Sequence, residues 1–237
     1  MDTIKINKKN VLMIAHRGVS GLETENTKEA FIIAGNKSYY GIETDVHVTL
    51  DGKFLICHDD NILRVTGKDL IIEQTNYDDI IKNKIYKFKT DINQLEFPNL
   101  TDYINICKKY NKEAILEIKN EVKEEDALRI VEEIKSIGWL EHTTIISFCV
   151  INLLNIRKYY KDIKLQFLTG EFNDDLLKTL VNNNISLDYY FGNLTKEIID
   201  KMHDNNLVVN CWTVDKEIDA DNLIDMGVDM ITSNILE

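Results

Sequence analysis

The sequence has few basic residues compared with its number of acidic residues. Its 237 residues include 28 lysines and arginines against 40 aspartates and glutamates, which gives a net charge of −12. Nucleic-acid binding needs clustered Lys and Arg that displace counterions from phosphates, so we expect no nucleic-acid partner. An anionic membrane surface would also repel the chain, and we expect no stable membrane association. A small phosphate-bearing substrate is compatible with this charge if a metal ion and a few local cations reverse the field inside a pocket.

Long apolar runs and paired cysteines are missing as well. Nowhere do about eighteen apolar residues follow one another, as a membrane-spanning helix requires, and residues 1–10 lack the apolar stretch of a signal peptide. We therefore expect a cytoplasmic protein. The four cysteines form no CxxC pair, which argues against a zinc site and against a disulfide framework. We expect them to be small buried side chains.

Short β-rich apolar runs recur along the chain, each followed by a longer amphipathic stretch, which is typical of βα units around a parallel sheet. The runs predict eight strands, at residues 11–15, 41–48, 114–118, 143–148, 164–168, 185–190, 207–213 and 229–232. The stretches between them predict seven helices, at about residues 27–39, 100–110, 122–137, 150–160, 173–182, 195–205 and 216–226. Eight strands with helical crossovers favour a closed (β/α)8 TIM barrel over an open sheet, and residues 1–237 are enough for one such domain.

One segment breaks this rhythm. Residues 53–58 form a strand-like run that follows the second strand after a short connection, and Asp51-Gly52 in that connection is a strong hairpin signal. We therefore predict an extra hairpin strand outside the α/β alternation. Residues 61–99 would then be a long irregular excursion, of a length that in a compact domain is expected to cover a site.

Acidic side chains stand where such a barrel keeps its catalytic groups, at the C-terminal ends of the strands. Glu43 and Asp45 are two residues apart on one strand, so both leave the same face and would repel each other unless a cation lies between them. Glu117, on an otherwise aliphatic strand, would complete an all-oxygen set of ligands that suits Mg2+ or Ca2+. An exposed strand end without a metal is the alternative for the first pair.

Two histidines and two cations stand at the same strand ends. His16 and His58 follow apolar strands, and an imidazole is the natural proton shuttle near neutral pH. One such histidine alone is more often a core residue, but two of them beside carboxylates indicate an acid and a base. Arg17 offers a planar fork that suits phosphate, and Lys119 shares the strand face of Glu117 and could meet a phosphate oxygen.

Taken together, these segments resemble the glycerophosphodiester phosphodiesterase family, through a series of motifs that occur in the family's order and spacing. The motifs are His16-Arg17-Gly18, Glu25-Asn26-Thr27, Ala30-Phe31, Glu43-Thr44-Asp45, His58-Asp59 and Glu117-Ile118-Lys119. Further along, Ser147-Phe148 and Trp212-Thr213-Val214 are similar to the family's later strands, so the resemblance spans nearly the whole chain. Each motif is weak alone, whereas the ordered set is specific.

The resemblance implies a barrel enzyme that hydrolyses glycerophosphodiesters to glycerol 3-phosphate and an alcohol. It implies one divalent cation held by Glu43, Asp45 and Glu117, with His16 and His58 as acid and base. It also implies that the neighbouring glycerol hydroxyl attacks phosphorus and that the cyclic phosphate is then hydrolysed. Glycerophosphocholine and glycerophosphoethanolamine are the substrates that the family would suggest. Two alternatives stay open: a lysophospholipase D acting on lysophospholipids, and a barrel that binds phosphorylated ligands without turning them over.

The sequence departs from the family pattern in three places. Thr24 stands where the family usually has a proline, which should change a loop and not the chemistry. The last strand ends in Thr232-Ser233 instead of Thr-Asp, which puts any contact made by that acid in doubt. After the eighth strand there is no room for a full closing helix before Glu237, so we expect the N-terminal segment, or a partner subunit in a homo-oligomer, to cap the barrel.

Overall fold

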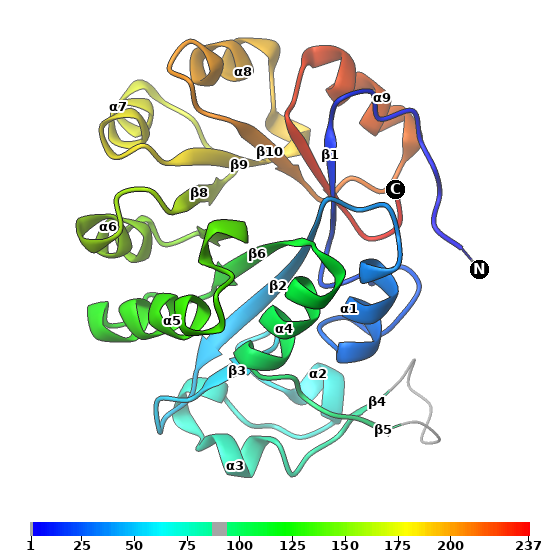
Figure 1. Ribbon diagram of the computed structural model, residues 1–237, viewed down its shortest axis with the longest axis vertical. Helices are drawn as coiled ribbons and strands as arrows, with labels where there is room; N and C mark the ends of the chain where they lie inside the picture. Colours follow the sequence, from blue (N-terminus) through cyan, green and yellow to red (C-terminus); the bar gives the residue numbers. More distant parts are fainter. Residues whose placement is uncertain (1, 87–93) are drawn as a thin grey trace.

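A computed structural model describes residues 2–86 and 94–237 and shows a closed barrel (Figure 1). Within these residues, the ring consists of eight parallel strands: β1 (Leu12–Ala15), β2 (Gly41–Val48), β6 (Glu113–Ile118), β7 (Thr143–Ser147), β8 (Lys164–Thr169), β9 (Ser186–Tyr190), β10 (Val209–Trp212) and β11 (Met230–Ser233). The ring closes because β1 pairs in parallel with both β2 and β11. The predicted TIM barrel is confirmed, and the ends of each predicted strand lie within two residues of the ends observed.

Helices follow the strands and form the outer layer, as predicted. They are α1 (Lys28–Gly35), α4 (Leu100–Tyr110), α5 (Glu124–Ile137), α6 (Val150–Tyr159), α7 (Asp174–Asn183), α8 (Lys196–His203) and α9 (Glu217–Met226), with short 3-10 turns η3 (Leu140–His142) and η4 (Phe191–Asn193). The first helix ends four residues before the predicted position. Asn36 Nδ2 donates a hydrogen bond to the Ile32 carbonyl at 2.7 Å, and this side chain competes with the backbone donor that would continue the helix.

The predicted hairpin strand is present as β3 (Phe54–Ile56), which pairs antiparallel with β2 and lies outside the ring. Gly52 in the turn has a φ of 74°, a conformation that glycine adopts without strain. Because β3 ends at Ile56, the next residues leave the sheet and carry His58 to the mouth of the barrel.

The excursion after β3 is not irregular, contrary to our prediction. Its described part contains α2 (Leu63–Thr66), η1 (Ile72–Gln74), α3 (Tyr77–Ile80), β4 (Ile85–Tyr86) and β5 (Gln94–Leu95), while residues 87–93 lie outside the described part. These short elements bury a second small core against β3, made of Leu55, Cys57, Ile62, Ile72, Ile80, Ile85 and Phe97. Elements of two to four residues are too short to show a periodic pattern, which explains why the sequence did not reveal them.

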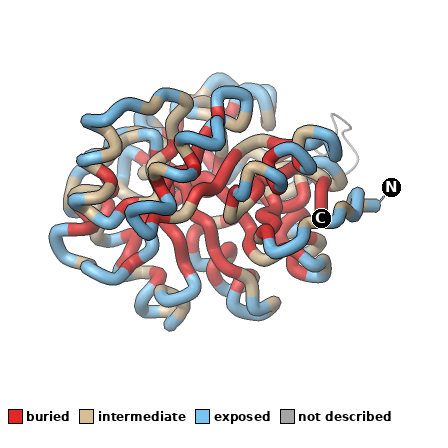
Figure 2. The backbone as a smooth tube through the Cα atoms, turned by 90° about the horizontal axis from the view of Figure 1, so that it is seen from above, coloured by how far each residue is buried: buried red, intermediate tan, exposed pale blue. Residues whose placement is uncertain are grey.

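The main core lies between the strands and the outer helices, and Figure 2 shows buried residues concentrated along the central strands. A smaller apolar layer fills the barrel interior with Ile14, Ile115, Ile146 and Leu168. Three cysteines are buried as expected, but Cys149 is only partly buried, and all four are free thiols. Among the described residues, no helix is long and apolar enough to cross a membrane.

The two ends of the chain lie against each other. Ile4 pairs with Leu236, the Ile4 amide donates to the Ile235 carbonyl at 3.0 Å, and the Glu237 amide donates to the Ile4 carbonyl at 2.8 Å. The Glu237 carboxylate also accepts hydrogen bonds from the Thr3 hydroxyl and the Ser38 amide. The N-terminal segment thus packs on the residues that follow β11, which is one of the two arrangements that we expected.

Candidate active site

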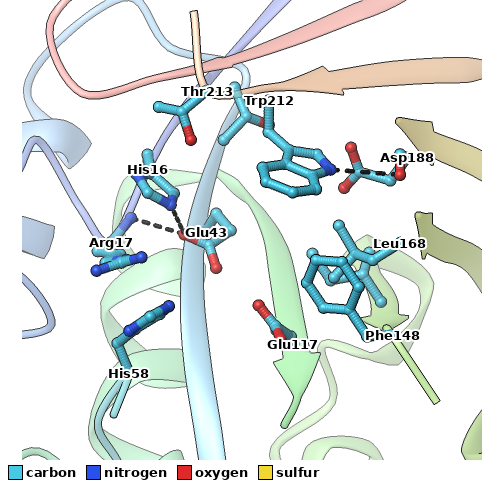
Figure 3. Close-up of a pocket in the computed structure, with 12 residues that line it drawn as sticks. His16, Arg17, Glu43, His58, Glu117, Phe148, Leu168, Asp188, Trp212 and Thr213 are labelled. Atoms are coloured by element: carbon cyan, nitrogen blue, oxygen red, sulfur yellow. Dashed lines mark hydrogen bonds and ion pairs between the residues drawn. The ribbon is translucent and has the colours of Figure 1, made fainter. Parts of the chain in front are cut away.

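A pocket opens inside the barrel at the C-terminal ends of the strands (Figure 3). One half of its wall is ionisable and consists of His16, Arg17, Glu43, His58 and Glu117. The other half is mostly apolar and includes Ile146, Phe148, Leu168 and Trp212, with Asp188 among them. Figure 3 shows the two histidines on one side, with Arg17 between them, facing Glu43.

Three carboxylates meet at this pocket. Glu43 and Asp45 leave the same face of β2, and Glu117 stands beside Asp45 in the register of β2 with β6. One oxygen of each group lies within 4.8 Å of the other two. All three are buried, with exposed fractions of 3%, 1% and 6% in chain order. Oxygen donors gathered in this way suit a hard cation such as Mg2+ or Ca2+.

Neighbouring donors contact some of the carboxylate oxygens of the cluster but not all of them. Asn26 Nδ2 donates to Asp45 Oδ2 at 2.7 Å. Lys119 Nζ lies 2.9 Å from Glu117 Oε1 and 3.4 Å from Asp45 Oδ1. Asp45 Oδ1 is buried and accepts no hydrogen bond, as expected of an oxygen that a cation would ligate. The residues present therefore fit a divalent cation.

The crowding of charge changes the acidity of the three groups. Burial, together with the charges of Asp45 and Glu117, raises the pKa of Glu43 well above its ordinary range. Burial and the charge of Asp45 likewise raise the pKa of Glu117 to about 8. Although burial also opposes ionisation of Asp45, the charges of Lys119 and Arg17 lower its pKa to about 2. One of the three carboxylates thus carries its charge readily, and the other two need a cation nearby.

His16 follows β1 and presents one ring nitrogen to the pocket. Its Nδ1 lies 2.7 Å from Asn234 Oδ1. Asn234 Nδ2 donates to Asp215 Oδ2 at 2.6 Å, so Asn234 Oδ1 accepts and we assign the ring proton to His16 Nδ1. The other nitrogen, Nε2, then holds a lone pair and lies 4.0 Å from Glu43 Oε2. Burial, together with the charge of Arg17, lowers the pKa of His16 to about 4, so the ring is neutral near neutral pH and Nε2 keeps its lone pair.

His58 follows β3 and is held by a chain of charged groups that begins in the excursion. His58 Nδ1 lies 2.7 Å from Asp59 Oδ1. Arg64 of α2 donates to the two oxygens of Asp59 at 2.6 and 3.0 Å, and to the two oxygens of Glu25 at 2.7 and 3.0 Å. Glu25 Oε1 also accepts from Arg17 Nη1 at 2.9 Å. The hydrogen bonds from Arg64 outweigh burial and lower the pKa of Asp59 to about 2, so a charged carboxylate stands beside the His58 ring.

The structure brings together the residues that the sequence singled out: His16, Arg17, Glu43, Asp45, His58, Glu117 and Lys119. Sequence reasoning gave no role to the residues that orient them: Glu25, Asn26, Asp59, Arg64 and Asn234. The residue after Thr232-Ser233 is Asn234, and its Oδ1 contacts His16 Nδ1. The motifs Glu25-Asn26-Thr27 and His58-Asp59 contain three of these partners, whereas no motif contained Arg64 or Asn234.

The raised pKa of Glu117 predicts how the stability of metal-free protein depends on pH. Below the ordinary pKa of 4.5 the group is protonated in folded and unfolded chains alike, and as pH rises toward about 8 the unfolded chain loses the proton first. Folding stability contributed by the protonated Glu117 is therefore lost as pH rises through about 8. In EDTA, Glu117→Gln should become more stable than the wild type by on the order of a few kcal/mol as pH increases over this window.

Urea unfolding of both proteins at a series of pH values measures this difference. Mg2+ or Ca2+ should restore the wild type more than the variant at the alkaline end, because only the wild type has three carboxylates, whereas the amide oxygen of Gln carries no charge. Glu141→Gln, at an exposed position in η3, is the matched control and should leave the pH dependence unchanged. A difference that stays flat across the window would contradict the described environment of Glu117.

Comparisons with known proteins agree with this fold and site. The model of the glycerophosphoryl diester phosphodiesterase family matches residues 16–237. A glycerophosphodiester phosphodiesterase of Bacillus altitudinis is 26% identical over 226 residues, which cover 92% of each chain. The crystal structure of a glycerophosphodiester phosphodiesterase from Parabacteroides distasonis superposes with a TM-score of 0.80 at 27% identity, covering 95% of this chain and 93% of the other.

A second solved structure extends the similarity of the fold. A phosphodiesterase of Oleispira antarctica, solved in complex with the product sn-glycerol-3-phosphate, gives a TM-score of 0.87 at 22% identity and covers 98% of this chain and 96% of its own. At that identity the likeness concerns the fold alone. The match of the family model is of another kind, since it extends from His16 to Glu237 and includes all the residues of the site. The chain therefore belongs to the glycerophosphoryl diester phosphodiesterase family.

Proposed function

We propose that this protein hydrolyses glycerophosphodiesters to glycerol 3-phosphate and an alcohol, with one divalent cation as cofactor. The observation that carries the proposal is the buried group of three carboxylates with two differently paired imidazoles in one pocket. Membership of a family named for this reaction supports it, and so does the glycerol 3-phosphate bound to the similar Oleispira antarctica protein.

Glu43, Asp45 and Glu117 would hold the cation, and their oxygen-only set favours Mg2+ or Ca2+. When bound, the cation would polarise the phosphoryl oxygens and lower the pKa of a nearby hydroxyl. Arg17 and Lys119 would add positive charge for the phosphate, which this acidic chain needs inside the pocket.

The two histidines would divide the proton transfers between them. The lone pair on His16 Nε2 would take the proton of the glycerol hydroxyl next to the phosphate, and that oxygen would form its bond to phosphorus. His58, beside the charged Asp59, would give a proton to the alcohol oxygen as its bond to phosphorus breaks. In the second step, water would open the cyclic phosphate with the two roles reversed. The neutral state of His16 is what favours it as the first base.

The size of the pocket bears on the alternative of a lysophospholipase D. The pocket holds about 100 Å3, which suits a three-carbon polyol and is far less than a long acyl chain fills. The other alternative is a barrel that binds phosphorylated ligands without turning them over. The absence of a catalytic group would support it, but the carboxylates and both imidazoles are present. We also propose that residues 1–237 act as one domain in the cytoplasm, where free thiols persist.

Phosphorus NMR of metal-stripped protein tests the proposed function directly. With glycerophosphocholine or glycerophosphoethanolamine, glycerol 3-phosphate should appear when Mg2+ or Ca2+ is added back and not in excess EDTA. His16→Gln and His58→Gln should each lower kcat by about a hundredfold to ten-thousandfold. Full turnover in EDTA, or phosphocholine in place of glycerol 3-phosphate as the product, would contradict the proposal.

Arg64 provides a test of how the excursion supports catalysis. Arg64→Met removes the fork that fixes Asp59 and Glu25, so we expect kcat to fall by about 10- to 100-fold through misplacement of His58 and Arg17. Arg64→Lys should recover only part of the loss, because a lysine cannot bridge both carboxylates. Arg129→Met is the matched control, since Arg129 is equally exposed but pairs with Asp126 on α5. Equal kcat values for the Arg64 and Arg129 variants would exclude the positioning role.

A further inference from the structure

Asp188 is a buried carboxyl group of the pocket that the proposed mechanism does not use. It lies on β9 between Leu168 of β8 and Asn210 of β10, is 1% exposed, and lines the pocket with its side chain. Figure 3 shows Asp188 beside Trp212, with its carboxyl group turned toward the indole ring. Asn210 makes a side-chain hydrogen bond to this group, but Asp188 Oδ1 has no partner. A buried oxygen without a hydrogen bond is costly in a folded protein, which points to a ligand that supplies one.

The surroundings of Asp188 select the chemistry of that ligand. The nearby wall is apolar, with Ile146, Leu168 and the ring of Trp212. Trp212 is held in place because its Nε1 donates to the Asp188 carbonyl at 3.3 Å and Phe148 packs against it with ring centroids 5.4 Å apart. Carbon atoms would contact these walls while one polar group reaches the carboxyl. A short alcohol has both features.

Charge argues for a neutral ligand group at this position. Burial and the charge of Glu117 raise the pKa of Asp188 well above its ordinary range, which favours the neutral form that can donate as well as accept. The cations of the pocket, Arg17 and Lys119, belong to the opposite half of the wall or lie beside the carboxylate cluster. A phosphate group therefore belongs with the cluster and not with Asp188, whereas a hydroxyl fits a neutral carboxyl.

We propose that Asp188 hydrogen-bonds to the terminal hydroxyl of the glycerol unit of the substrate and thereby selects diesters in which this hydroxyl is free. The inference rests on the proposed function. With the phosphate at the carboxylate cluster and the adjacent hydroxyl at His16, the terminal hydroxyl is the group one carbon further from phosphorus. Asp188 is the buried carboxyl group of the remaining wall, whose other buried polar side chain is Thr232. In a 1-acyl lysophospholipid this oxygen carries the acyl ester, so the same contact would exclude that substrate class.

A pair of diesters that differ only in this hydroxyl tests the inference. Glycerophosphocholine carries it, whereas 2-hydroxypropyl phosphocholine lacks it and keeps the hydroxyl that attacks phosphorus. The wild type with Mg2+ or Ca2+ should favour glycerophosphocholine by about tenfold or more in kcat/KM. Asp188→Leu should lose activity only on glycerophosphocholine, which would reduce this preference below about twofold. Asp188→Asn keeps hydrogen-bonding atoms and should retain most of the preference.

Turnover of 2-hydroxypropyl phosphocholine serves as the internal control for folding of each variant. If Asp188→Leu does not fold, a comparison of two inhibitors of the wild type, glycerol 3-phosphate and 2-hydroxypropyl phosphate, takes the place of this variant. Glycerol 3-phosphate should then bind more tightly by about tenfold or more. Equal kcat/KM values for the two diesters in the wild type, or a preference that survives in Asp188→Leu, would overturn the role of Asp188. If the wild type turns over neither diester with either metal, the proposed function itself fails, and the inference fails with it.

Discussion

Mutual repulsion among three buried carboxylates is the constraint on which this site depends. Glu43, Asp45 and Glu117 approach within 4.8 Å inside the barrel, where little water is present to screen them. Lys119 and Arg17 offset part of the repulsion, yet Glu43 and Glu117 still have raised pKa values. We therefore expect the proposed cation to stabilise the folded chain, which would link stability to cofactor binding.

The two histidines that we propose as base and acid differ in their surroundings. Each histidine follows a strand that ends at the mouth of the barrel. Their partners differ: His16 faces the neutral amide of Asn234, and His58 faces the charged carboxylate of Asp59. The excursion contributes to this difference, because Arg64 of α2 fixes Asp59 and the small core under α2 holds Arg64 in place. This flank therefore acts as a support for the site and not as an irregular cover.

Local pattern in the sequence was enough for the ring and the chemical groups, but not for their supports. The period of two along β2 placed Glu43 and Asp45 on one face, and the apolar runs located the strand ends where His16 and His58 stand. The partner of His16 could not be found in this way, because Asn234 lies 218 residues away and meets it only when β11 pairs with β1. Asp188 was missed for a related reason. A role for a single acidic residue in an apolar strand can be inferred only once the pocket wall around it is known.

A single bound ion at the carboxylate cluster is the claim on which the proposed chemistry stands. Anomalous diffraction from a crystal soaked in Mn2+, a stand-in for Mg2+ that scatters strongly enough to be located, would test it most directly. The account predicts one strong peak bounded by oxygens of Glu43, Asp45 and Glu117. A cluster without a peak in a crystal that binds Mn2+ elsewhere, or a peak whose ligands do not include these carboxylates, would contradict it.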